Sequence, residues 1–348
     1  MLRSPTKHRG KTSTSVRLAE QGYFWVGVTY EQRDGQSIVD GSQMYVEFQR
    51  PEEQTQPFPV VFIHGGGGQG LDWMATPDGR PGWRTLLLQR GYAVYTIDRP
   101  GHGRSPVRPS HPDGGAIPAS AETLGPLFAG ADNPDHTQWP GSGLPDDQAL
   151  AQLLASQSNM PDLNADHELM RKHGAELLDR IGPSIVITSS AGGPAGWLMT
   201  DAKPDLVRAV VALEPMGPSG PFPLPWGLSA SPLTYDPPAT GTQDLKLLEV
   251  PAADGLPAMR LQSEPARRLP HLAETPIAIV SGEQSVAKPV DFGTVAYLRQ
   301  AGCNRVHHLQ LGDLGIHGNG HLMMIEHNND QVLDAVVQWL DDHVDHEG

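Results

Sequence analysis

The sequence predicts an α/β fold in which a mostly parallel sheet carries helices on both faces. Two observations lead to this prediction. Apolar runs typical of strands buried on both faces alternate with helix-type segments through most of the chain. Glycines and polar residues follow the ends of these runs. Since ligands of such sheets bind beyond the carboxyl ends of the strands, we expect these polar residues to converge on one site.

The chain opens with two β-type segments, residues 23–30 and 44–48. The stretch Arg33-Asp34-Gly35-Gln36 between them is rich in turn formers, which favours an antiparallel hairpin. After the hairpin come continuous apolar runs, each short enough to be a strand and bounded by turn residues. These buried strands are expected at residues 59–63, 92–97, 184–187, 207–213, 277–280 and 306–311.

Helix-type segments lie between the expected strands. Asn164 is suited to cap the helix that leads to the strand at 184–187. The last helix is amphipathic and follows Asn328 or Asn329 as its cap, with Val332, Val336, Leu340 and Val344 on one face. The expected helices cover residues 83–90, 146–156, 165–180, 194–199 and 331–344.

We expect a single domain over residues 18–348 with two irregular insertions, at about 106–163 and 216–275. Both are too long for ordinary connections within a compact domain, and the first is rich in Pro, Gly, Asp and Ser. We interpret them as cap segments over the end of the sheet that carries the site. Residues 1–17 are expected to form a disordered N-terminal arm.

Composition limits the classes of partner. The formal net charge is −15, from 25 Lys and Arg against 40 Asp and Glu, which disfavours nucleic acid because phosphate binding requires a basic surface. Cys303 is the single cysteine, so an intrachain disulfide and a metal site with two thiolates are excluded. The sequence contains neither a membrane-spanning run nor the apolar stretch of a secretory signal, so a cytoplasmic protein without a membrane partner is expected. Oligomeric state stays open, with a homodimer as one option.

A strand that turns sharply into a helix around a serine is the layout of a nucleophile elbow. Here the strand at 184–187 leads into Thr188-Ser189-Ser190-Ala191-Gly192, and a helix follows. Ser190 is the candidate nucleophile because small residues, Thr188 and Gly192, flank it at both required positions. Ser189 is the weaker candidate, because Ile187 would then occupy a position that needs a small side chain.

A serine needs an adjacent base, normally histidine, to remove its proton. His321 lies between Gly320 and an apolar run, in a stretch expected to be the loop between the last strand and the last helix. Such a loop can bring an imidazole over the serine, so His321 is the first candidate. His317, in the same glycine-rich stretch, is the alternative.

Two carboxylates follow strand ends and could orient the histidine. Glu214 ends the buried strand at 207–213, and Glu283 follows the strand at 277–280. In many hydrolases the acid follows the penultimate strand, but the expected spot here holds Ser285, which cannot serve as the acid. A charged residue that ends a buried strand needs a partner, which His321 would supply for Glu214. Glu283 stays the alternative acid.

Acyl transfer also needs donors for the oxyanion. One is expected to be the backbone N–H of Ala191, the residue after the nucleophile. The second is expected to come from the glycine loop after the strand at 59–63, at Gly66. A phosphate-binding loop is the rival interpretation, but neither G-x-x-x-x-G-K-[ST] nor a spaced G-x-G-x-x-G before a helix is present.

These residues resemble the α/β-hydrolase superfamily over about residues 20–345. His64-Gly65-Gly66 is similar to its oxyanion loop, and residues 98–105 are similar to its D-x-x-G-x-G-x-S turn. More narrowly, the chain resembles the Alcaligenes-type esterase family and its fungal relatives, at residues 76–83, 213–215, 225–228, 232–238 and 318–321. That resemblance implies that a glutamate after strand six is the acid, which favours Glu214 over Glu283. The departures from the pattern are Thr188, which replaces the usual glycine at the first small position of the elbow, and Ser189 beside the nucleophile.

The function predicted is a serine hydrolase that cleaves a small carboxylic ester through an acyl-enzyme, with no cofactor and no metal. A lactonase that opens a cyclic ester with the same residues is the first alternative. The cap aromatics Trp226, Phe222 and Tyr235 are then expected to line the substrate pocket, with the core of the cap as the alternative place for them. A catalytically silent hydrolase fold that only binds a ligand is the alternative from another class.

Overall fold

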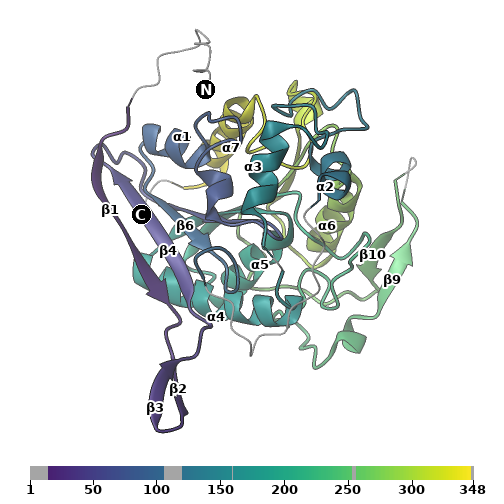
Figure 1. Cartoon of the computed structure of the whole chain (residues 1–348). Helices are drawn as coiled ribbons and strands as arrows, with labels where there is room; N and C mark the ends of the chain where they lie inside the picture. Colours follow the sequence, from purple (N-terminus) through teal and green to yellow (C-terminus); the bar gives the residue numbers. More distant parts are fainter. Residues whose placement is uncertain (1–14, 106–119, 159, 253–255, 346–348) are drawn as a thin grey trace, which may run out of the picture.

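A computed structural model describes residues 15–105, 120–158, 160–252 and 256–345. Its centre is an eight-stranded sheet in the order β1-β4-β6-β5-β7-β8-β11-β12 (Figure 1). Every neighbouring pair from β6 to β12 is parallel, whereas β4 is antiparallel to both β1 and β6. The predicted mostly parallel sheet is therefore confirmed. The strands are β1 (Leu18–Val26), β4 (Met44–Pro51), β5 (Val60–Ile63), β6 (Val94–Asp98), β7 (Ser184–Ser189), β8 (Val207–Leu213), β11 (Ile277–Ser281) and β12 (Val306–Gln310).

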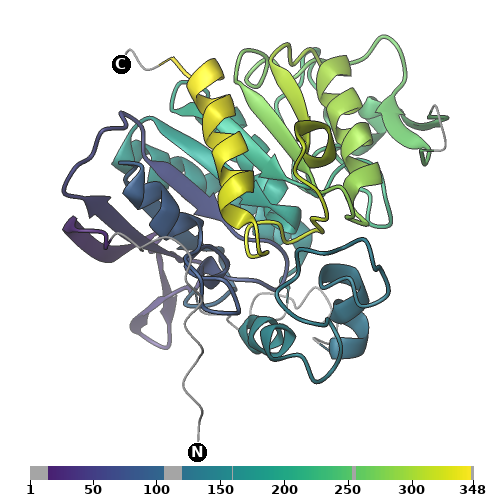
Figure 2. The same ribbon diagram turned by 90° about the horizontal axis from the view of Figure 1, so that it is seen from above.

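Helices cover both faces of this sheet, as Figures 1 and 2 show. Alternate residues of the strands point to opposite faces, so β5, β6, β7, β8, β11 and β12 each contribute to two hydrophobic cores. One core includes α4, α5 and α6, and the other includes α1 and α7. The helices are α1 (Trp83–Gln89), α2 (Ala121–Phe128), α3 (Gln148–Ser156), α4 (Leu163–Ile181), α5 (Gly193–Ala202), α6 (Lys288–Gln300) and α7 (Asn329–His343). The 3-10 turns are η1 (Gly70–Trp73), η2 (Ser190–Gly192), η3 (Thr242–Leu245) and η4 (Leu311–Leu314).

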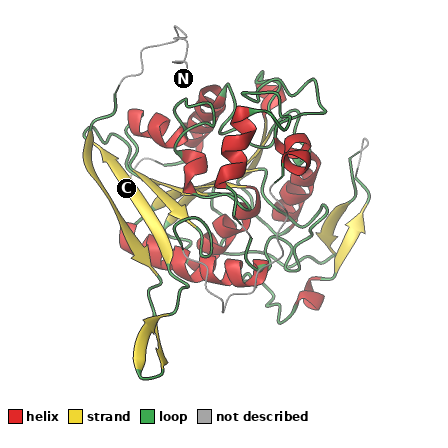
Figure 3. Ribbon diagram, viewed as in Figure 1, coloured by secondary structure: helices red, strands yellow, loops and turns green. Residues whose placement is uncertain are grey.

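The N-terminal strands differ from the expected simple hairpin. β1 pairs with β4 in the main sheet, and the turn at residues 33–36 belongs to a separate hairpin of β2 (Tyr30–Arg33) and β3 (Gln36–Val39). This hairpin projects away from the body of the molecule (Figure 3). The turn residues were correctly interpreted, but the sequence between the two long strands holds two further short strands.

Helix boundaries also differ in places. The cap of α4 is Asp162, whose Oδ1 accepts from the N–H groups of Asn164 and Ala165, so the predicted cap Asn164 lies inside the helix. α2 was not predicted, because Gly125 and Pro126 interrupt its helix-type pattern. α6 was also not predicted.

The two insertions have structure of their own. α2 and α3 belong to the first insertion, whose residues 106–119 lie outside the described chain. The second contains a hairpin of β9 (Leu247–Val250) and β10 (Met259–Gln262), and β10 packs against α6. The predicted disordered arm falls largely on residues 1–14, which are also outside the described chain. Within the described ranges, no helix combines the length and the apolar character needed to cross a bilayer.

Candidate active site

Ser190 lies at a sharp turn between β7 and α5. Its φ is +53°, a left-handed conformation that non-glycine residues rarely adopt. A side chain on Gly192 would overlap the carbonyl oxygen of His64, so this position must stay small. Thr188 takes the place of the usual glycine, and its methyl group faces Gly196 of α5. A Cβ on Gly196 would lie 3.3 Å from that methyl group, so the absence of a side chain on Gly196 gives Thr188 its space. The backbone here therefore has the geometry expected of a nucleophile elbow.

Glu214 and His321 are in direct contact. Oε2 of Glu214 lies 2.5 Å from Nδ1 of His321, and both side chains are buried. Glu214 follows β8 and has a φ of +44°, a second strained position at the same end of the sheet. Its other bonds come from the N–H of Gly282, at 2.7 Å, and the hydroxyl of Ser285, at 2.5 Å. Ser285, at the spot where many hydrolases place the acid, thus donates to Glu214.

The alternative residues form a different pair. Nδ1 of His317 lies 3.1 Å from Oε1 of Glu283, and the N–H of Gly318 donates to the other oxygen. These two bonds hold the pKa of Glu283 below its usual value. The His317 side chain is 65% exposed, and neither residue lines the pocket at Ser190. The structure therefore separates His317 and Glu283 from the elbow.

Ser190 and His321 line one small pocket, with a cavity volume of about 30 Å³. Gly65, Gly66 and Gly68 of the glycine loop line it as well. The ring of Phe128, from α2, stacks on the ring of His321 with 5.4 Å between their centroids. The first insertion therefore forms part of the site. The apolar wall consists of Phe128, Leu153, Leu322, Met324 and Ile325.

The predicted aromatic wall lies elsewhere, which corrects the expectation for the second insertion. Phe222 is 63% exposed at the surface. Tyr235 is buried in the core, where its hydroxyl donates to the carbonyl of Trp226. Trp226 itself packs against that core. None of the three lines the pocket at Ser190, because their side chains fill the interior of the insertion or face solvent.

The glycine loop after β5 approaches the elbow closely. A Cβ on Gly66 would lie 3.2 Å from that of Ala191, so these two candidate oxyanion donors are neighbours. The carbonyl of Gly65 belongs to the same peptide group as the N–H of Gly66. This carbonyl accepts a hydrogen bond from Nη2 of Arg99 at 2.8 Å and lies 2.9 Å from Nδ1 of His64. The N–H of Arg99 donates to Nε2 of His64. Burial and the nearby Arg99 lower the pKa of His64, so His64 is neutral and orders the loop.

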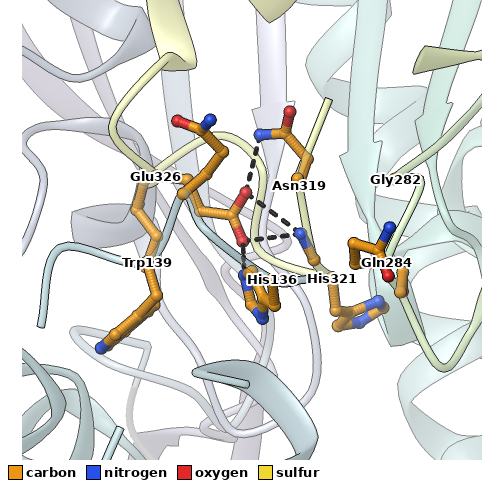
Figure 4. A network of polar contacts seen from close by, with 12 residues as sticks. His136, Trp139, Gly282, Gln284, Asn319, His321 and Glu326 are labelled. Atoms are coloured by element: carbon orange, nitrogen blue, oxygen red, sulfur yellow. Dashed lines mark hydrogen bonds and ion pairs between the residues drawn. The ribbon is translucent and has the colours of Figure 1, made fainter. Parts of the chain in front are cut away.

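A buried carboxylate network holds the turn that precedes His321 (Figure 4). Glu326 is fully buried and accepts bonds from Nδ2 of Asn319 at 2.7 Å, from the N–H of Gly320 at 2.9 Å, and from Nε2 of His136 at 2.6 Å. His136 comes from the first insertion. Sequence reasoning missed both Glu326 and His136. For Glu326 the sequence offered one signal, an acidic residue that directly follows the apolar run at 322–325.

Asp72 is a further carboxylate at the pocket. Burial, and secondarily the charge of Asp98, raise its pKa to about 7. Between about pH 4 and pH 7, the Asp72 carboxyl is therefore protonated in the folded chain but ionised in the unfolded chain. Because of this difference, the contribution of Asp72 lowers the free energy of unfolding as pH rises through that range.

We expect Asp72→Asn to reduce the loss of unfolding free energy between pH 5 and pH 8, because the amide has no proton to release. Urea unfolding at both pH values measures this difference in the wild type and the variant. Asp205→Asn serves as the control, since Asp205 is exposed. Equal pH dependence in the wild type and Asp72→Asn would show that Asp72 does not titrate in this range.

Among the described residues, no group of three or more His, Cys, Asp or Glu side chains is arranged to hold a metal ion. The arrangement at the pocket consists of a strained serine, a histidine bound to a carboxylate, and a glycine loop close to the residue after the serine. Nucleophilic acyl transfer is the reaction class for which these parts are suited.

Comparison with known proteins identifies the family and agrees with the fold. Residues 60–335 match the model of a family described as "Alpha/beta hydrolase family". The chain is 37% identical over 353 residues to a protein named "Probable secreted lipase phiG" from Fungal sp. (strain ATCC 74256), with 97% of this chain and 92% of the fungal protein covered. The structure reported as "The Atomic Resolution Structure of a Novel Bacterial Esterase" superposes with a TM-score of 0.67 at 22% identity, and covers 97% of this chain and 99% of that one.

The fungal relative also corrects one expectation. Its name describes a probable secreted protein, which contradicts the prediction of a cytoplasmic location. That prediction rested on a local sequence signal, the apolar stretch of a secretory leader, and such a signal is not a direct test of location.

Proposed function

The chain belongs to the alpha/beta hydrolase family and is a carboxylic ester hydrolase, and from this premise we propose which residues perform the reaction. Ser190 is the nucleophile, His321 is the general base and acid, and Glu214 orients His321. The N–H groups of Gly66 and Ala191 bind the oxyanion.

One observation carries this proposal: the short bond between Nδ1 of His321 and Glu214, in a pocket that His321 shares with Ser190. A carboxylate on Nδ1 keeps the proton there and leaves Nε2 free to accept one. The imidazole can then take the proton of Ser190, whose hydroxyl is a poor nucleophile without a base. Glu214 also stabilises the imidazolium that results.

The reaction proceeds in two halves. Oγ of Ser190 attacks the ester carbonyl carbon as its proton moves to Nε2 of His321, and the carbonyl oxygen becomes an oxyanion between Gly66 and Ala191. The tetrahedral intermediate collapses, the C–O bond to the alcohol breaks, and His321 protonates the departing alkoxide. Water then attacks the acyl-enzyme with the same base, which releases the acid and restores Ser190.

The pocket lining supports an uncharged substrate with an apolar part. Its wall is formed by aliphatic, methionine and phenylalanine side chains, which bury alkyl groups favourably. An anionic substrate group would lie near the Asp72 carboxyl, which is unfavourable once that carboxyl ionises. No observation favours a lactone, because the aromatic wall expected to enclose one lies outside the pocket.

Hydrolysis of a panel of nitrophenyl esters of increasing acyl length, together with lactones of increasing ring size, tests this function. We expect turnover of the esters, with complete loss after a fluorophosphonate labels one serine. Peptide mapping should place the label on Ser190. Label on Ser189, or labelling without loss of turnover, would contradict the assignment, and faster turnover of lactones would favour the alternative substrate.

A further inference from the structure

The turn that carries the proposed base is held by Glu326, five residues further along the chain. Both oxygens of this carboxylate accept from the N–H of Gly320, at 2.9 and 3.2 Å, and Oε2 also accepts from the side chain of Asn319. Asn319 exchanges two further bonds with Asn328. The backbone directly before His321 is therefore fixed by a buried carboxylate, independently of the bond between His321 and Glu214.

His136 reaches this carboxylate from the other side, as Figure 4 shows. Its Nε2 lies 2.6 Å from Oε1 of Glu326, and the two side chains are 4% and 0% exposed. Its ring also fills the space beside the turn, because a side chain on Gly320 would overlap it. His136 thus contacts both the carboxylate and the peptide next to His321.

The pair joins two distant parts of the chain. His136 lies in the first insertion, between α2 and α3, and is separated from Glu326 by 190 positions. Backbone bonds accompany the contact: the N–H of Gln138 donates to the carbonyl of Gly318, and the N–H of His327 donates to the carbonyl of Gln138. Through these contacts the insertion is bound to the loop that carries the base.

A buried carboxylate is costly unless donors or a cation satisfy it. Without the donor Nε2 of His136, Glu326 would lose one bond and would be exposed to the space that the ring had filled. The carboxylate and the turn would then rearrange. Because Gly320 is bonded to Glu326 and is the neighbour of His321, such a rearrangement would displace the imidazole relative to Ser190.

We propose that His136 is a positioning residue of the active site, which acts through Glu326 to hold His321 in line with Ser190. The first insertion then does more than cover the pocket, since it completes the support of the base. This inference rests on the proposed function, in which His321 is that base.

The first test is His136→Ala in the full chain, assayed with a nitrophenyl ester. We expect kcat to fall by about 10- to 100-fold, the size of effect that a small misplacement of a catalytic group produces, with KM changed less than about twofold. Added imidazole should restore part of kcat, because it can occupy the vacated space and donate to Glu326. His327→Ala is the matched control, since His327 is an exposed histidine of the same loop.

A second variant separates positioning from stability. Glu326→Gln, combined with His136→Ala, removes the buried charge, so we expect Tm to recover from its value in His136→Ala while kcat stays low. Recovery of kcat together with Tm would overturn the inference, as would wild-type kcat in His136→Ala. Ser190→Ala, assayed in parallel, tests the proposed function separately. If Ser190→Ala is inactive and His136→Ala is fully active, only the positioning role of His136 is overturned. If Ser190→Ala retains activity, both the proposed function and the positioning role are overturned.

Discussion

Ser190→Ala is expected to lower kcat for a nitrophenyl ester by about 10⁶-fold, the size of loss found when the nucleophile of a serine triad is removed. The methyl group cannot form an acyl-enzyme, so only the activation of water by His321 and the oxyanion donors would remain. Steady-state assays give kcat, and fluorophosphonate labelling should disappear at the same time.

Ser189→Ala is the matched control for this change. Ser189 is the neighbouring serine, has ordinary extended backbone, and is fully buried at the end of β7. We expect its activity to stay within about threefold of the wild type, since a buried hydroxyl with no role in the reaction contributes mainly to packing. If Ser190→Ala retained activity and Ser189→Ala lost it, the nucleophile would be Ser189.

Glu214→Gln should lower kcat by about 10⁴-fold, as the loss of the orienting carboxylate does in other serine triads. The amide keeps the size of the side chain, but it cannot stabilise the imidazolium, and its NH₂ group favours the wrong tautomer of His321. The strained backbone of Glu214 places no new demand on glutamine, so circular dichroism and thermal unfolding should detect a folded protein.

Glu283→Gln, the same substitution at the rival acid, is expected to change kcat less than about twofold. Its partner His317 lies largely in solvent, where ion pairs contribute little. A greater loss of kcat in Glu283→Gln than in Glu214→Gln would reverse the assignment of the acid and would require His317 to be reconsidered as the base.

The central strands of the sheet could be predicted from the sequence because they are buried on both faces. A parallel strand that is buried on both faces must be apolar over most of its length, so β5, β7, β8 and β11 each contain a continuous apolar run of three to five residues. Elements that depend on their surroundings were missed. α2 contains Gly125 and Pro126 and is stabilised by packing of Leu124 and neighbouring side chains, which no local pattern reveals.

Part of the candidate site was likewise accessible from local signals. A serine in a small-residue turn, a carboxylate at the end of a buried strand and a histidine among glycines are each recognisable without a structure. The structure then brings Glu214 into contact with His321, a pair that spans 107 positions, and separates Glu283 and His317 from both. Their catalytic roles remain predictions that the substitutions above test.

The aromatic residues of the second insertion do not line the pocket at Ser190, and the reason is physical. Apolar character alone says that Trp226, Phe222 and Tyr235 prefer contact with other apolar groups, but it does not say which cavity or core supplies them. In the folded chain the core of the second insertion takes Tyr235 and Trp226, while Phe128 and Leu153 of the first insertion reach the pocket.

By itself, the sequence determined the α/β architecture, the position of the sharp turn at Ser190 and the order in which the candidate serine, acid and histidine follow one another along the chain. These properties follow from backbone geometry and burial within a few neighbouring residues. Tertiary structure alone decided that Ser285 donates to Glu214, that Phe128 stacks on His321, and that His136 meets Glu326. Each of these contacts joins segments far apart in the chain, and only the packing of the insertion and loops against the end of the sheet brings them together.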